Sequence, residues 1–162
     1  MKAEIPQPWA AEEILALGRS YQGAAALAAA AELDLFGSLS AAPLPAADLA
    51  RRLQCDQRAV TILLDALVAL RLLEKSGGNY ALPAGLNAFL THDGTQSVLA
   101  MAQHQAHCLR NWAQLAQVVK TGRPAECIPG VRGRDGAQEA FTIGGLKVVT
   151  DGGQRSQRAG AI

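Results

Sequence analysis

The sequence predicts a mainly α-helical fold: a winged helix-turn-helix with additional long helices, a two-stranded β-wing and an irregular C-terminal tail. The prediction depends mostly on residues 44–82, where two segments with helical apolar spacing flank a tight turn. Leu49 and Leu53 lie four apart in the first segment, and the second repeats apolar residues at threes and fours, so each helix has one apolar face. Behind them, Gly77-Gly78-Asn79 can join two short strands.

The N-terminal region is expected to form a helix that cannot bury much surface by itself. Pro8 suits its first position, and Glu12 and Glu13 then lie where the helix dipole favours negative charge. Apolar residues recur at threes and fours from Ile14, and residues 24–31 are all alanine except for one leucine. Alanine is the best helix former but presents little side-chain area, so this helix needs a partner from this chain or from a second copy.

Residues typical of helix ends and turns predict where the elements around the helix-turn-helix begin and end. An apolar corner at residues 33–36 precedes Gly37, which is expected to end the N-terminal helix, and residues 40–44 are expected to form a Pro/Ala linker. Asp56 is expected to cap the second helix of the motif, because its carboxylate can accept from free N–H groups of the first turn. After the wing, residues 83–90 predict a short helix or turn.

The longest helical pattern covers residues 95–121 and stops at Gly122-Arg123-Pro124. Beyond this point the apolar stripe disappears. The predicted organisation is therefore a helical winged-helix domain at residues 1–124, a linker or short helix at 125–143 and an irregular tail at 144–162.

Composition and net charge limit the classes of protein to which this chain can belong. The chain is 49% hydrophobic but only 4% aromatic, so alanine, leucine and valine must build the core. A formal net charge of +1 gives no field that argues for a nucleic acid or a membrane partner. Three cysteines without a C-x-x-C pair suit reduced thiols, and neither a signal peptide nor an apolar run of ~20 residues is present. A cytoplasmic protein is predicted.

Three stretches together resemble the N-terminal dimerisation domain of S-adenosylmethionine-dependent O-methyltransferases that act on small molecules. They are the alanine-rich segment 24–39, the helix-turn-helix and wing at 47–82, and the region from Asn111 that contains Trp112, residues 121–124 and Phe141. The resemblance covers residues 14–141. It implies a homodimer that serves methyl transfer to a hydroxyl of a small aromatic acceptor.

The resemblance does not extend to a catalytic domain. The cofactor, S-adenosylmethionine, therefore belongs to the parent enzyme, and no catalytic or cofactor-binding residue is assigned in this chain. The chain looks like a truncated or frame-shifted enzyme and is expected to be inactive alone. Residues 147–153 are faintly similar to the strand and glycine turn that hold the cofactor, but the rest of such a motif is not present.

The resemblance also implies an interface and a pocket wall. The dimer-interface candidates are Tyr21, Ala24, Leu27, Ala28, Ala31, Leu35, Phe36, Leu99 and Leu109. The substrate-pocket candidates are His104, His107 and Trp112. Two departures from the family pattern stand out. Arg71 occupies a position where glycine is common, so the helix cap there is expected to be made in another way, and Gly144-Gly145 replaces a continuing helix.

Three side chains on the last long helix have the spacing of metal ligands. His104, His107 and Cys108 lie at i, i+3 and i+4, so they can share one helical face, with His92 or Cys127 as a fourth ligand. Partly buried polar residues on an amphipathic helix explain the same spacing. No metal ligand is therefore assigned.

Two other interpretations remain open. One is a winged-helix DNA-binding regulator, which needs cationic or amide side chains on the outer face of its second helix. Here that face carries Arg58 and Asp65, and the charges of the whole motif nearly cancel, so a nucleic-acid partner is not expected. The other is a decayed reading frame without a function. No serine lies in a nucleophile elbow, which gives no support to an isolated hydrolase.

Overall fold

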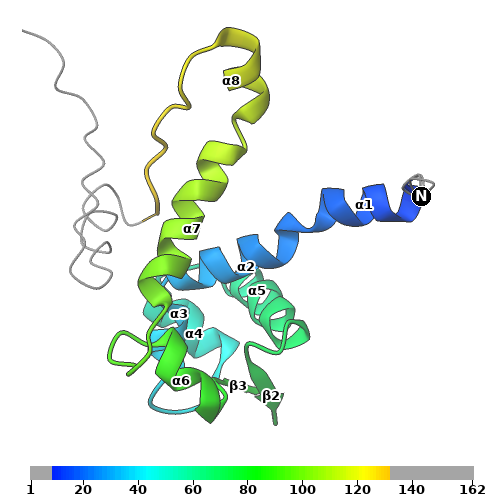
Figure 1. The fold of residues 1–162 in the computed structure, drawn as a ribbon. Helices are drawn as coiled ribbons and strands as arrows, with labels where there is room; N and C mark the ends of the chain where they lie inside the picture. The colour runs from blue at the N-terminus through cyan, green and yellow to red at the C-terminus, as the bar shows by residue number, and fades with distance from the viewer. Residues whose placement is uncertain (1–8, 132–162) are drawn as a thin grey trace, which may run out of the picture.

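The structure, a computed structural model, describes residues 9–131. As predicted, it is mainly helical with one small antiparallel sheet. The helices are α1 (Ala11–Arg19), α2 (Tyr21–Glu32), α3 (Leu35–Leu39), α4 (Ala46–Leu53), α5 (Gln57–Ala69), α6 (Ala84–Leu90), α7 (Leu99–Trp112) and α8 (Leu115–Thr121), and the strands are β1 (Leu44–Pro45), β2 (Glu74–Ser76) and β3 (Asn79–Ala81). Figure 1 shows a body made of α2 to α6 and the sheet, from which α1 and the α7–α8 end project in different directions.

The helix-turn-helix forms where the sequence predicted it. Leu49 of α4 and Leu64 and Leu67 of α5 are buried in a shared core. Asp56 precedes α5, and its Oδ1 accepts a hydrogen bond of 2.8 Å from the backbone N–H of Ala59. One free donor of the first turn is thereby satisfied, and the predicted cap is confirmed.

The predicted two-stranded wing is formed by β2 and β3, and a third strand, β1, extends the sheet. Strand β3 lies between β1 and β2 and is antiparallel to both, with Tyr80 opposite Leu44 on one side and opposite Lys75 on the other. The segment expected to be a linker therefore supplies β1. Gly77 and Gly78 turn the chain between β2 and β3 at φ values of +55° and +82°, which glycine adopts without a steric cost.

The end of the alanine-rich helix differs from the prediction. Helix α2 ends at Glu32, and Asp34 turns the chain with a left-handed φ of 56°, a conformation that Asp tolerates better than most residues. Gly37 lies inside α3 and does not end a helix, so that expectation was wrong. A Cβ at Gly37 would lie 2.7 Å from Oδ1 of Asp34, so glycine is needed there for close approach.

The end of α5 also differs from the prediction. Arg71 takes a left-handed φ of 60°, its N–H donates to the carbonyl of Val68, and the N–H of Leu72 donates to the carbonyl of Leu67, both at 2.9 Å. These are the bonds of a helix C-cap that usually contains glycine. The expectation of a different cap was wrong, because Arg71 itself adopts the glycine conformation.

Two helices predicted as continuous are each divided. Ser20 separates α1 from α2, and its hydroxyl donates to the carbonyl of Leu17 at 2.8 Å, a back-bond that often bends helices. The pattern predicted at 95–121 begins as a helix only at Leu99 and is interrupted between Trp112 and Leu115. The first division occurs where α1 leaves the body, and the second lies near the outer end of the segment formed by α7 and α8 (Figure 1).

The core joins the alanine-rich helix to α7. Among the described elements, α2 makes its most extensive contact with α7, and Ala28, Ala30 and Ala31 of α2 are buried. Ala102 and Ala106 of α7 are also buried, so small side chains on both helices allow close approach. In the part of the chain described, no helix has the length and apolar character needed to cross a membrane.

Candidate functional site

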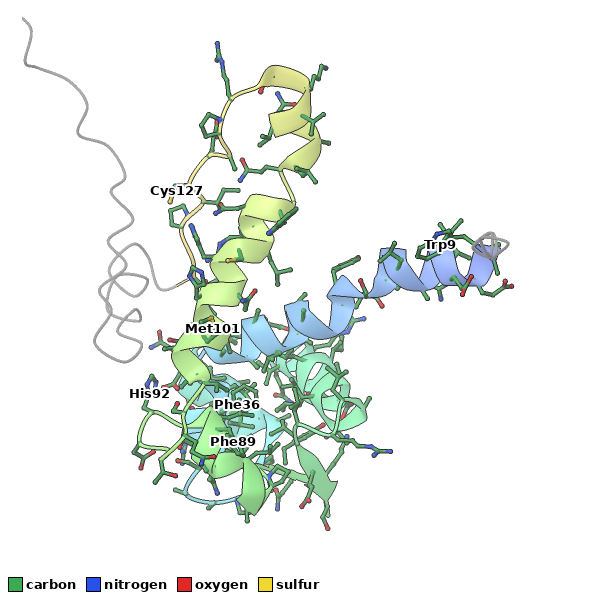
Figure 2. All side chains as sticks on the ribbon, viewed as in Figure 1. Trp9, Phe36, Phe89, His92, Met101 and Cys127 are labelled. Carbon is green, nitrogen blue, oxygen red and sulfur yellow. The ribbon has the colours of Figure 1, made fainter. Side chains whose placement is uncertain are left out.

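The candidate site is an exposed apolar surface on two projecting segments. The first is the N-terminal arm, residues 9–21, and the second is the C-terminal arm, residues 109–121. Large apolar side chains are left exposed on both, namely Trp9, Ile14, Leu15, Leu17, Tyr21, Trp112, Leu115 and Val119. We call this set the arm surface. Figure 2 shows Trp9 at the far end of α1, well away from Phe36 and Phe89 in the body.

The N-terminal arm contains a formed helix that no described part of the chain buries. No residue of α1 is buried, and Leu17 and Tyr21 are 63% and 58% exposed. Its start is capped, since the side chain of Glu13 accepts from the N–H of Ala10 at 2.8 Å. A nine-residue helix gains most of its stability from packing of its apolar face, so this face is suited to a partner.

The predicted dimer-interface residues divide into two groups. Ala28, Ala31, Leu35, Phe36 and Leu99 are buried within the single chain, where they form part of its own core. The family resemblance implied that they lie at the interface, and periodicity could not correct this, because it shows that a face is apolar but does not show what covers it. Of the other four, Tyr21 and Ala24 are exposed, and Leu27 and Leu109 are half-buried. Only these four have surface left for a second chain in this conformation.

The predicted pocket residues all lie on α7. Nε2 of His104 lies 3.3 Å from Sγ of Cys108, and Nε2 of His107 lies 3.1 Å from Nδ2 of Asn111. Both imidazoles thus contact the next turn of the helix, and their ring centroids are 6.4 Å apart. Trp112 ends α7 and is 69% exposed.

The same histidines do not belong to a metal site in the part of the chain that the structure describes. Within residues 9–131, no three His, Cys, Asp or Glu side chains are placed to hold a metal ion. His92, a possible fourth ligand, lies elsewhere, with its Nε2 3.2 Å from Oδ1 of Asp34. Cys127 is exposed on the chain that follows α8.

A separate hollow of about 520 Å³ opens beside the body. It is lined by Glu32, Leu33, Asp34, Ser38, Arg52, Leu53, Gln54, Cys55 and Val131. None of the three predicted pocket residues lies on its wall. The hollow therefore does not represent the acceptor pocket that the sequence predicted on α7.

The outer face of α5 decides how well the winged helix suits DNA. Arg58, Ile62 and Asp65 are exposed there. Oδ1 of Asp65 accepts from Nζ of Lys75 at 2.7 Å and from the hydroxyl of Tyr80 at 2.8 Å. A carboxylate in the middle of this face would repel phosphates, and the cation of the wing is already paired with it.

These contacts shift two pKa values. The hydrogen bond from Lys75, followed by that from Tyr80, holds the pKa of Asp65 below its ordinary value. The hydrogen bond to Asp65 is likewise the main cause that raises the pKa of Lys75. Both shifts favour the charged pair, so the wing is attached to α5 at neutral pH.

Two polar contacts that join α2 to α7 were not predicted from the sequence. Nε2 of Gln103 donates to the carbonyl of Ala31 at 3.1 Å. Nη1 of Arg110 lies 2.9 and 3.0 Å from the two carboxylate oxygens of Glu32, and both side chains are largely buried. The only signal in the sequence was a charged residue at the edge of each apolar stripe, which is too common to indicate a pair.

Comparison with known proteins relates this arrangement to a family. A family model described as the O-methyltransferase dimerisation domain matches residues 17–92. The tetracenomycin polyketide synthesis 8-O-methyl transferase TcmO of Streptomyces glaucescens is 46% identical over 65 residues, which cover 40% of this chain and 19% of TcmO. The N,N-dimethyltransferase OxyT of Streptomyces rimosus is 34% identical over 116 residues, which cover 69% of this chain and 33% of OxyT.

Solved structures of methyltransferases are also similar to this chain over part of their length. PigF with SAH matches with a TM-score of 0.62 and 32% identity, covering 70% of this chain and 34% of PigF. Human N-acetylserotonin methyltransferase in complex with SAM matches with a TM-score of 0.60 and 27% identity, covering 74% of this chain and 37% of that enzyme. The chain thus spans between about a fifth and about a third of the length of the curated relatives it matches.

Proposed function

Residues 17–92 of this chain form an O-methyltransferase dimerisation domain, and from that premise we propose that the chain pairs with a second copy of itself through the arm surface. The family implies a homodimer. The observation that carries the proposal is the N-terminal arm, a capped helix whose large apolar side chains are more than half exposed in the described part of one chain. Pairing would remove that face from water, at a gain of roughly 25 cal/mol for each Å² of apolar area buried.

We further propose that the paired domain forms a wall of the acceptor pocket in a complete methyltransferase. His104, His107 and Trp112 are the proposed wall residues, supported by the exposure of Trp112 and by the partial exposure of both histidines on α7. The parent reaction is methyl transfer from S-adenosylmethionine to a hydroxyl of a small aromatic molecule. TcmO is named as an O-methyl transferase and OxyT as an N,N-dimethyltransferase, and the hydroxyl acceptor proposed here corresponds to the first of them.

Sedimentation velocity over a concentration series tests the pairing. The wild-type chain is expected to be a dimer at tens of micromolar, and Leu17→Glu and Trp112→Glu are expected to shift it towards monomer by placing a charge in the arm surface. Ile62→Glu is the matched control, because Ile62 is 61% exposed on α5, outside the arm surface. A wild-type monomer at tens of micromolar, or a control that dissociates as readily as the arm variants, would contradict the proposal.

Two binding measurements separate this proposal from its alternatives. Calorimetry with S-adenosylmethionine is expected to give no stoichiometric binding to this chain, since we place the cofactor site in the parent enzyme. A mobility shift with duplex DNA over a salt series is expected to give no complex. Salt-sensitive binding that weakens in Arg58→Ala would favour a regulator instead.

A further inference from the structure

The segment after α8 returns along α7 and is held there. Gly122 turns the chain with a φ of +68°, and residues 122–131, which we call the return strap, then run back beside α7 (Figure 1). The strap contains no helix or strand. An extended segment without its own backbone ladder stays in one place only if other groups bond to it.

The first attachment is a side-chain amide that serves both backbone groups of one strap residue. Nε2 of Gln114 donates to the carbonyl of Glu126, and Oε1 of Gln114 accepts from the N–H of Glu126, both at 2.9 Å. The same Nε2 lies 3.2 Å from the carbonyl of Arg110 in α7. Gln114 thus connects the end of α7, the start of α8 and the strap.

The second attachment lies where the strap reaches α2. A Cβ at Gly130 would be 2.1 Å from Oε1 of Glu32 and 3.2 Å from Nη2 of Arg110, so only glycine fits without displacing this ion pair. The carboxylate of Glu32 is therefore contacted by α7 on one side and by the strap on the other. Val131 follows directly and lies on the wall of the hollow.

We propose that the return strap is a latch that fixes where the chain leaves this domain. Gln114 holds its middle, and Gly130 packs its end on the Glu32–Arg110 pair, so residue 131 is placed against the hollow beside α2 to α4. A segment joined beyond residue 131 starts from a fixed position relative to the α2–α7 contact. The inference does not depend on the proposed dimer, because every contact in it lies within one chain.

Amide hydrogen exchange of the whole chain, followed by NMR at Glu126 and by mass spectrometry over residues 122–131, tests the latch. In the wild type, the Glu126 amide is expected to exchange more slowly than an amide in an unstructured chain. Gln114→Ala removes both bonds to Glu126, and exchange there is expected to rise by about tenfold. Gly130→Ala is expected to raise exchange over residues 126–131.

A control and a rescue distinguish the latch from a general loss of stability. Gly85→Ala is the matched control, because a Cβ there meets nothing within 4 Å, and strap exchange is expected to stay unchanged. Glu32→Ala removes the carboxylate that a Cβ at Gly130 would strike. In the Glu32→Ala background, Gly130→Ala is therefore expected to change amide exchange of the strap much less than Gly130→Ala does in the wild-type background.

The opposite results would overturn the latch. These are a wild-type Glu126 amide that exchanges at the unstructured rate, or a Gln114→Ala variant that folds and leaves Glu126 unchanged. Equal effects of Gly130→Ala with and without the Glu32 carboxylate would also reject the second attachment.

Discussion

Lys75 and Asp65 join the wing to the second helix of the helix-turn-helix. Nζ of Lys75 donates to Oδ1 of Asp65 at 2.7 Å and lies 4.9 Å from the centroid of the Tyr80 ring, while the Tyr80 hydroxyl donates to the same oxygen. Three side chains thus hold β2 and β3 on α5. The wing is attached to its own domain through the groups that a DNA-binding wing would leave free for phosphates.

The pair predicts a pH-dependent contribution to stability. Because the folded pKa of Asp65 lies below 3.8, its contribution is complete above 3.8 and is lost as the pH falls through the folded value. Because the folded pKa of Lys75 lies above 10.5, its contribution is complete below 10.5 and is lost as the pH rises through the folded value. The free energy of unfolding of the wild type should therefore exceed that of Asp65→Asn by a constant amount between these limits.

Chemical denaturation at a series of pH values measures this difference. It should be small, since both side chains are partly exposed and surface pairs are weak. Tyr80→Phe removes only the hydrogen bond from the Tyr80 hydroxyl to Asp65. Its free energy of unfolding should therefore lie between those of the wild type and Asp65→Asn. A gap between wild type and Asp65→Asn that widens below pH 3.8 would show that the sign is wrong.

Asp56 gives a local prediction. Asp56→Ala removes the acceptor for the Ala59 N–H at the start of α5 and should lower the free energy of unfolding by ~1 kcal/mol. Asp56→Ser keeps an acceptor and should recover most of the loss. Urea denaturation of the three proteins checks this, and equal losses for alanine and serine would mean that the cap does not stabilise the helix.

Asp56 also illustrates which parts of the structure the sequence could predict. Its cap and the apolar stripe behind it depend on residues within one or two turns, so spacing alone identified them. The wing followed from Gly77-Gly78 for the same reason. By contrast, β1 was missed because two residues at 44–45 become a strand only by pairing with β3, more than thirty residues later in the chain.

The candidate site was less predictable because it depends on contacts between distant segments. The stripe of α2 was recognised as apolar, but Ala28 and Ala31 are buried within the chain and are not left for a second copy. The Glu32–Arg110 pair and the Gln114–Glu126 contact were missed, because nothing near each residue indicates its partner. No residue of α1 was among the predicted interface residues, and the N-terminal arm was represented only by Tyr21 at the start of α2, since periodicity indicates an apolar face whether it is covered or open.

Alanine substitutions of two large apolar residues on α5 distinguish its buried face from its exposed face. Leu64→Ala should lower the free energy of unfolding by about 2–5 kcal/mol, because Leu64 is fully buried and a cavity would remain. Ile62→Ala, on the exposed side of the same helix, should change it by less than about 0.5 kcal/mol. Thermal or urea unfolding compares them. A large loss at Ile62 would mean that this face is covered in solution.

Arg71 yields a prediction of increased stability. Its left-handed φ of 60° is strained for a residue with a Cβ, while glycine adopts it freely and is the usual residue at this cap position. Arg71→Gly should therefore raise the free energy of unfolding, by up to about 1 kcal/mol. The backbone bonds from Arg71 to Val68 and from Leu72 to Leu67 remain available, since neither involves the arginine side chain.

Two further glycine variants make the Arg71 test specific. Gln54 ends α4 with a φ of 54° and similar backbone bonds, so Gln54→Gly should also stabilise. Ala66→Gly, inside α5, should instead destabilise by about 1 kcal/mol, because glycine there costs backbone entropy and gains no conformational relief. Urea denaturation of the three variants should thus give two gains and one loss. A loss at Arg71 would show that its side chain stabilises the end of α5 by more than its backbone conformation costs.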